Sequence, residues 1–250
     1  MRTQDLPAIS LEELQSRAEL LTRVDRKYLL RPAQAEAVLD RLDAGCRVLE
    51  IDGRRSFGYA STYFDTPDRE SFHATATGRR RRWKVRTRTY LDSGQRWLEI
   101  KTQGLRGRTL KERIPVQPDH GDELAEEVVT LIEQRLRAVR AIDRPWRARP
   151  TLHTAYDRCT VLLADGTSRA TIDTRLRWSL PDGTHLDPKD LVILETKSPG
   201  SATALDRLLW GTGHRPARIS KFGTGLALLD PTLPANRWHR HLTGEGPLTA

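Results

Sequence analysis

Charged residues alternate with uncharged residues between positions 82 and 89, and this alternation restricts the possible folds more than any other feature of the sequence. Side chains on a β-strand point in turn to its two faces, so one face of this segment carries Arg82, Lys84, Arg86 and Arg88. Trp83 and Val85 lie on the opposite face. The segment therefore predicts a strand with one cationic face and one partly apolar face.

The same period of two recurs around residues 95–103, 109–116, 172–177 and 191–198. The charged faces of these four predicted strands carry Glu99, Lys101, Lys111, Arg113, Asp173, Arg175, Arg177, Glu195 and Lys197. On a half-exposed sheet such faces simply contact water. A pattern that recurs on five strands favours a shared cause, and the helices of the chain suggest one.

Helical patterns at 9–21, 31–45, 67–78, 119–142 and 201–213 separate about eight predicted strands. Short turns such as "DSG" and "GLRG" join antiparallel neighbours. We therefore expect an α+β domain over residues 1–230, built as an eight-stranded antiparallel β-barrel with flanking helices, and a loosely ordered tail over 231–250.

Helices that cover the barrel need an apolar outer face, so the charged faces are expected to line its interior. Unpaired charges in a dry core are too costly, so this interior is predicted to be a wet tunnel that holds a polyanion and a cation. The net charge of +9 agrees with an anionic partner. Cys46 and Cys159 form no metal or redox motif, and we expect both to be reduced core residues.

The sequence contains no run of about eighteen apolar residues and no apolar stretch near its start. We therefore expect a cytoplasmic protein without a transmembrane segment, and association with a separate membrane protein stays open. The basic run at 79–88 leaves a surface nucleic-acid site as a further alternative, but strict alternation is not needed on such a surface. No nucleic-acid partner is expected.

Eight motifs in order resemble those of the VTC domain, a polyphosphate polymerase domain related to the CYTH-like triphosphate tunnel metalloenzymes. The motifs are "RVDRKYLL", "STYFDT", "KVRTRTY", "LEIKTQG", "LKERIPV", "AYDRCTV", "VILETK" and "RISKFGTGLAL". The resemblance covers residues 8–230. It implies an eight-stranded antiparallel tunnel that binds triphosphate or polyphosphate together with Mn²⁺ or Mg²⁺.

The resemblance also implies which residues act. Phosphate-binding positions are Lys27, Arg86, Arg88, Lys101, Lys111, Arg158, Arg218 and Lys221, and catalytic ones among them are Arg86, Arg88, Lys101 and Lys111. Glu195 matches the metal-binding carboxylate, and Glu99 is a second candidate. Structural alternatives remain: Glu99 could pair with Lys101 or Arg86, and Arg158 with Asp157 or Asp173.

The window at 23–27 lacks the paired glutamates of many tunnel hydrolases and retains Asp25. This favours polyphosphate synthesis from a nucleoside triphosphate. Hydrolysis of inorganic or nucleoside triphosphates, with Glu99 or Asp25 orienting the water, and polyphosphate binding without turnover remain the alternatives.

Overall fold

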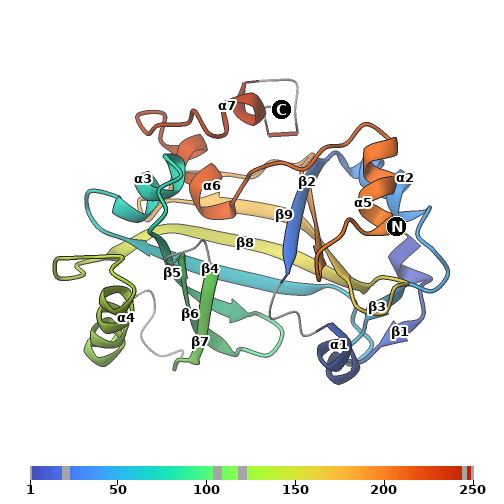
Figure 1. The fold of residues 1–250 in the computed structure, drawn as a ribbon, viewed down its shortest axis with the longest axis horizontal. Coiled ribbons are helices and arrows are strands. Elements are labelled where there is room, and N and C mark those ends of the chain that lie inside the picture. The colour runs from blue at the N-terminus through green and yellow to red at the C-terminus, as the bar shows by residue number, and fades with distance from the viewer. Residues whose placement is uncertain (1, 19–22, 104–108, 118–122, 244–246, 249–250) are drawn as a thin grey trace.

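One large β-sheet forms the centre of the molecule, and helices lie around its outside (Figure 1). The computed structural model describes residues 2–18, 23–103, 109–117, 123–243 and 247–248. Within these residues the sheet has eleven strands, and eight of them form a continuous hydrogen-bonded path in the order β2-β11-β9-β8-β4-β5-β6-β7. All pairs along this path are antiparallel.

The eight strands of the path are β2 (Val24–Leu30), β4 (Phe57–Asp65), β5 (Arg82–Tyr90), β6 (Arg96–Gln103), β7 (Thr109–Pro115), β8 (Arg149–Leu162), β9 (Arg169–Ser179) and β11 (Val192–Ser198). Three short strands are added to it. They are β1 (Ala8–Ile9), β3 (Arg47–Leu49) and β10 (His185–Leu186). β1 pairs in parallel with β3, which pairs with β8, and β10 pairs with β9.

The helices are η1 (Arg2–Gln4), α1 (Leu11–Ala18), α2 (Pro32–Leu39), α3 (Glu70–Ala76), α4 (Glu126–Ala138), α5 (Ala204–Gly211), α6 (Lys221–Leu229) and α7 (His239–Leu242). In the part of the chain described above, no helix combines the length and the apolar character needed to cross a membrane.

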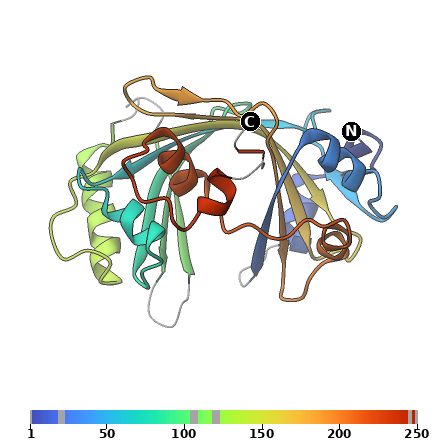
Figure 2. The same cartoon turned by 90° about the horizontal axis from the view of Figure 1, so that it is seen from above.

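The α+β class, the antiparallel sheet and the flanking helices confirm the prediction from sequence, but the closed eight-stranded barrel needs correction. The sheet curves round from β7 to β2 (Figure 2), and in the described segments no pairing joins these two end strands. The alternation shows which face of each strand lies inside, but pairing of the two end strands depends on how far the whole sheet curves, which no local pattern encodes.

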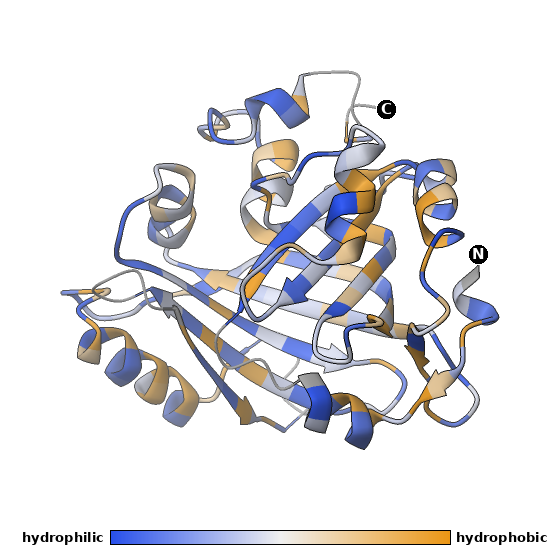
Figure 3. Cartoon of the chain, turned by 45° about the vertical axis from the view of Figure 1, so that its right-hand side comes forward, coloured by the Kyte–Doolittle hydropathy of each residue, from blue (hydrophilic) through white to orange (hydrophobic). Residues whose placement is uncertain are grey.

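The apolar faces of the strands lie outward, where helices cover them. Leu39 of α2 and Leu209 of α5 pack with Ile172 and Leu194, and all four side chains are nearly inaccessible to solvent. On the other side of the molecule, α4 brings Ile132 and Leu136 against the outer face of β5 and β6. Figure 3 shows hydrophilic and hydrophobic residues alternating along the strands. The charged faces therefore point inward, as the alternation predicts.

One predicted charged face is interrupted by an irregularity in β9. Asp173 points inward and pairs with Arg158, but Arg175 has a φ of 51° and lies opposite a register shift between Ala155 and Asp157. The shift turns Arg175 toward Asp157, with 82% of its side chain exposed. The prediction that Arg175 and Arg177 share a face with Asp173 is therefore wrong, because a bulge reverses the alternation between them.

The predicted tail contains two buried apolar residues. Trp238 is 1% exposed and lies 5.8 Å from Phe72, measured between ring centroids, and Leu248 belongs to the same apolar cluster. The division of the chain into a domain over 1–230 and a tail over 231–250 stays a prediction.

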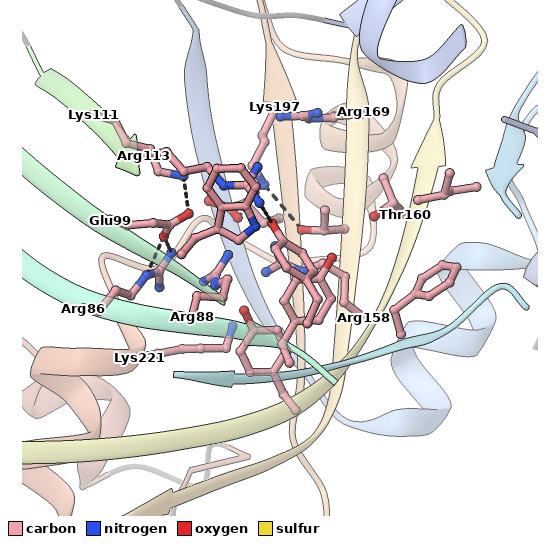
Figure 4. A pocket seen from close by; sticks show the side chains of 18 of the residues that line it. Arg86, Arg88, Glu99, Lys111, Arg113, Arg158, Thr160, Arg169, Lys197 and Lys221 are labelled. Carbon is pink, nitrogen blue, oxygen red and sulfur yellow. Dashed lines mark hydrogen bonds and ion pairs between the residues drawn. The ribbon is translucent and has the colours of Figure 1, made fainter. Parts of the chain in front are cut away.

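Helix α6 is held in place by close contacts between glycine and tryptophan. Ser220 caps the helix by accepting a hydrogen bond from the Gly223 N–H at 3.0 Å. The Trp178 Nε1–H donates to the Lys221 carbonyl oxygen at 2.8 Å, and Gly225 lies directly against the Trp178 indole. These contacts fix the first residue of the helix, Lys221, whose side chain points toward the inner face of the sheet (Figure 4).

We predict that Gly225→Ala destabilises the protein, because an added Cβ would lie under 3.0 Å from the Trp178 ring. Overpacking of this kind costs about 1–3 kcal/mol. Gly211→Ala is the matched control, since a Cβ there has no heavy atom within 4 Å. We expect it to be neutral or to stabilise by about 0.5 kcal/mol, as alanine favours helices. Urea unfolding measures both variants, and equal free energies of unfolding would contradict the prediction.

Candidate active site

The inner face of the sheet encloses a cavity of about 1080 Å³. All eight strands of the continuous path contribute side chains to its wall, and α6 adds Lys221 and Phe222. The wall is mostly cationic and aromatic (Figure 4). A charged lining of this size is incompatible with a dry core, so the cavity is a wet interior, as the alternation predicts.

The structure brings most of the predicted site residues together. The cavity wall contains Lys27, Arg86, Arg88, Lys101, Lys111, Arg158 and Lys221, together with both candidate metal ligands, Glu195 and Glu99. Arg218 is separate from them. It precedes α6 and lines a second pocket of about 700 Å³, which shares Lys27, Lys84 and Lys101 with the first. Whether any of these residues binds phosphate or metal stays a prediction.

Three carboxylates on the inner face each hold two cations. The sets are Glu99 with Arg86 and Lys111, Asp173 with Arg158 and Lys221, and Glu195 with Lys27 and Lys197. In each set the carboxylate faces a cation directly across an antiparallel strand pair, namely Arg86 and Glu99, Arg158 and Asp173, and Lys27 and Glu195. We refer to these three sets as the cation–carboxylate triads.

The Glu99 triad joins three adjacent strands. Arg86 Nε donates to the Glu99 carboxylate at 2.6 Å, and Lys111 Nζ donates to its other oxygen at 2.7 Å (Figure 4). Burial would raise the pKa of Glu99, but the charges of Arg86, Arg88 and Lys111 hold this pKa well below its usual range. Glu99 is therefore ionised at neutral pH and is a poor proton acceptor. The sequence leaves Lys101 and Arg86 as possible ion-pair partners of Glu99, and the structure shows the pair with Arg86.

The Asp173 triad joins β8, β9 and α6. Arg158 donates to both carboxylate oxygens of Asp173, at 2.6 and 2.8 Å, and Lys221 donates to one of them. Burial opposes ionisation of Asp173, but Arg158 and Lys221 keep its pKa well below the usual range. The side chain is only 2% exposed, so removing it would leave two cations without a counterion.

The Glu195 triad lies where β2, β11 and β9 meet. Glu195 accepts from Lys27 Nζ at 2.6 Å and from Lys197 Nζ at 2.5 Å, and Lys197 also reaches the Thr171 hydroxyl at 3.4 Å. Desolvation lowers the pKa of Lys197 to about 8, although the charge of Glu195 opposes this change. Lys197 is therefore easier to deprotonate than an ordinary lysine.

The donor set around Glu195 determines how a divalent metal could bind. Among the residues whose placement is described, no three His, Cys, Asp or Glu side chains come close enough to form a metal site. Mg²⁺ commonly binds through one or two carboxylates plus substrate phosphates, with oxygen ligands throughout. Glu195 fits a metal that enters with a phosphate chain, because the phosphate oxygens would supply the remaining ligands.

Lys84 and Lys101 are cross-strand neighbours on β5 and β6, and neither forms an ion pair within the described chain. Desolvation, together with Lys101 and Lys27, lowers the pKa of Lys84 well below its usual value. Lys84 Nζ lies 5.7 Å from the centroid of the Phe222 ring. These lysines are therefore cations of the cavity that no carboxylate of the described residues pairs with directly.

Aromatic rings support the cations on the side formed by β4 and β8. Tyr59 and Tyr156 stack with an interplanar angle of 2°, and Arg158 lies 5.3 and 5.2 Å from their centroids. Lys221 Nζ lies 4.2 Å from the Tyr156 centroid, and Arg88 5.4 Å from that of Tyr59. Cation–π contacts of this kind hold the guanidinium groups in fixed orientations.

Sequence reasoning identified the cavity's cations better than its other residues. Lys84 and Lys197 are on the predicted charged faces but were not among the predicted phosphate-binding positions, although their strand position gave the signal. Arg169, which also lines the wall, and the aromatic support of Tyr59 and Tyr156 had no comparable signal. Asp173 was considered only as a structural partner of Arg158, which it is.

The VTC domain family model matches residues 22–230 of the chain. No curated protein matches it. Among solved structures, the fold resembles an adenylyl cyclase candidate from Hippeastrum described as having a dominant triphosphatase activity, with a TM-score of 0.49 and 14% identity over 82% of this chain and 95% of that chain. It also resembles an adenylate cyclase candidate from Bacillus halodurans, with a TM-score of 0.47 and 11% identity over 76% of this chain and 87% of that chain. Both likenesses are distant.

We predict that Asp173→Asn destabilises the free protein but increases its stabilisation by tripolyphosphate. Breaking a buried ion pair costs about 3–5 kcal/mol, because the partner charges lose their counterion, and an added polyanion can replace it. Asp187→Asn is the control, since its pair with Arg177 is exposed and worth about 0–1 kcal/mol. Thermal unfolding with and without tripolyphosphate measures both effects. If tripolyphosphate raises the melting temperature of Asp173→Asn no more than that of the wild type, the ligand does not replace the lost carboxylate as a counterion.

We also predict that tripolyphosphate affinity weakens as the pH rises from about 7 to about 9. Lys197 loses charge in this range because its pKa is about 8, and desolvation also lowers the pKa of Lys84. Lys84→Arg should weaken the pH dependence, because a guanidinium stays protonated. Calorimetric titration of both proteins at each pH measures their affinities for tripolyphosphate. Comparing the two proteins removes the effect of the ligand's own ionisation, which is the same for both. Equal slopes for the two proteins would rule out a contribution from Lys84.

Proposed function

Because the chain belongs to the VTC domain family, we propose that it binds triphosphate and polyphosphate in the cavity and transfers phosphoryl groups. The reaction that we favour is polyphosphate synthesis from a nucleoside triphosphate. The observation that supports this proposal most directly is the surplus of cations over carboxylates on a wet inner wall, with three carboxylates acting as counterions.

Phosphate groups would replace carboxylates as partners of the cavity's cations. Arg86, Arg88 and Arg158 present planar guanidinium groups suited to bidentate contacts with phosphate oxygens. Lys101 and Lys111 add point charges on neighbouring strands. Charge that develops on the transferred phosphoryl group would be stabilised by groups that are already oriented, because the tyrosines and carboxylates hold them in place.

Mn²⁺ or Mg²⁺ bound at Glu195 would neutralise part of the phosphate charge. Glu195 is the residue of this chain that would hold the ion, and Lys27 and Lys197 would turn from Glu195 to the phosphate oxygens. The same movement frees both oxygens of the carboxylate. Arg218 lies outside the cavity wall, so we do not retain it among the residues that contact the transferred group.

The state of the carboxylates favours synthesis over hydrolysis. In synthesis, an oxygen of the terminal phosphate of the growing polyphosphate chain attacks the γ-phosphorus of the nucleoside triphosphate. The bond between that phosphorus and the β–γ bridging oxygen breaks, and a nucleoside diphosphate leaves. That nucleophile is already ionised and needs no base. Hydrolysis needs a carboxylate to orient water, but Glu99 is held by two cations and Asp25 pairs with Arg23 at 2.9 Å.

Polyphosphate binding without turnover and triphosphate hydrolysis remain the alternatives, and one experiment separates them. The protein is incubated with ATP and Mn²⁺ or Mg²⁺, and long-chain polyphosphate, orthophosphate and ADP are quantified. We expect polyphosphate and ADP with little orthophosphate. Orthophosphate without chains would indicate a triphosphatase. Tight ATP binding without any product would indicate a binding module, and absence of both binding and product would overturn the proposal.

We predict that Arg86→Ala lowers kcat/KM for ATP by about 10²-fold, because the variant loses a charge-assisted contact to the transferred group. Arg177→Ala is the matched control, since Arg177 lies on the outside of the sheet with 57% of its side chain exposed. We expect its kinetics to match those of the wild type. Equal losses in the two variants would show that net charge, and not the cavity, determines activity.

A further inference from the structure

An aromatic and cationic group at one rim of the cavity is not used by the phosphate chemistry. It consists of Tyr90 at the end of β5, Trp97 near the start of β6 and Arg113 on β7, and all three line the cavity. Trp97 is the cross-strand partner of Arg88, and Arg113 is the partner of Glu99. The group therefore borders the row of cations directly, and we refer to it as the rim platform.

Arg113 contacts both aromatic side chains of the rim platform. The Arg113 guanidinium carbon lies 3.9 Å from the centroid of the Trp97 ring and 5.1 Å from that of Tyr90. Arg113 also donates a hydrogen bond to the Tyr90 hydroxyl at 2.8 Å. Arg113 lies beside Lys111 in the close view of the cavity (Figure 4). The contacts orient a flat guanidinium and a flat indole at the edge of the proposed phosphate path.

Trp97 has a hydrogen-bond donor that nothing satisfies. Its Nε1–H is shielded from solvent and has no partner among the described residues. A shielded donor without an acceptor is costly, but several other buried side-chain atoms of the described residues also lack a partner, so this donor does not define a ligand site by itself.

The chemistry of the rim platform suits a flat ring better than another phosphate. Aromatic faces carry negative potential, which disfavours an anion but allows stacking of planar groups. Nucleobases stack on aromatic and guanidinium planes whatever their identity, and they carry ring nitrogens or carbonyl oxygens that accept hydrogen bonds. Only one of the three platform side chains is a cation, whereas cations predominate deeper in the cavity.

The position of the rim platform also matches a nucleotide. Residues two apart on one face of a strand are about 7 Å apart, so Trp97 lies about that far along β6 from Glu99, beside Arg88. This distance is comparable to the span of a ribose between a phosphate and its base. Phosphates bound by Arg86, Arg88 and Lys111 would therefore place the base at the rim.

We propose that Trp97, Arg113 and Tyr90 bind the nucleobase of a nucleoside triphosphate donor. The base stacks on the planar groups of the rim platform, whose guanidinium already lies over the indole. This inference rests on the proposed function, because it assumes that the triphosphate occupies the cavity. It adds that the donor is recognised by its base as well as by its phosphates.

The test compares ATP with tripolyphosphate, which has the phosphates but no base. Calorimetry in metal-free buffer gives both dissociation constants without turnover. We expect the wild type to bind ATP more tightly than it binds tripolyphosphate, because ATP also carries the base. Trp97→Leu should raise the ATP dissociation constant about tenfold, which is the scale of one lost base stack, and change that of tripolyphosphate less than twofold.

Two further variants interpret the result. Arg113→Gln, on the edge strand β7, should weaken ATP more than tripolyphosphate, because it removes a stacking group as well as one cavity charge, and it stands in if Trp97→Leu does not fold. Lys101→Met should weaken both ligands, because it removes a charge from the cavity. Equal weakening of ATP and tripolyphosphate by Trp97→Leu or Arg113→Gln would overturn the base site, as would no weakening of either. Failure of the wild type to bind tripolyphosphate would instead overturn the proposed function.

Discussion

The cation–carboxylate triads allow this chain to place its charges inside and its apolar residues outside. A closed core of arginine and lysine would unfold, because desolvation of each cation costs several kcal/mol without a counterion. Glu99, Asp173 and Glu195 each supply that counterion for two cations. The helices then cover the apolar outer face, and the wet cavity remains. Every other property of the site depends on this balance, including the pKa of its carboxylates and the orientation of its arginines.

The period of two predicted this polarity from sequence because alternation is a local property of a strand. It placed Arg86, Arg88, Lys101 and Glu195 on the inner face without knowledge of the fold. The prediction failed at Arg175, where a bulge with a positive φ occurs at a non-glycine residue and leaves no pattern in the sequence. Closure of the barrel failed for a different reason. Pairing between β2 and β7 depends on how far the whole sheet curves, and no local pattern of the sequence encodes that.

The composition of the site was predictable in part. Cations on the predicted faces were identified through family motifs, and Lys84 and Lys197 could have been added by the alternation alone. Arg218, whose role in phosphate binding stays a prediction, lines the second pocket. It is three residues from Lys221, but only Lys221 is held at the start of α6 by Trp178 and turned toward the inner wall. Pairs such as Asp173 with Lys221 join β9 to a helix 48 positions away, and no local pattern encodes them.

The triads also determine which cations a polyanion can bind without first breaking an ion pair. A phosphate that binds Arg86, Arg158 or Lys27 must first separate that cation from its carboxylate, so the net gain is the difference between two ion pairs. Lys84 and Lys101 have no such pair to break in the described chain. Both line the second pocket as well as the main cavity. A chain longer than three phosphates would therefore gain most by extending over these two lysines, toward the second pocket and away from the rim that carries Trp97.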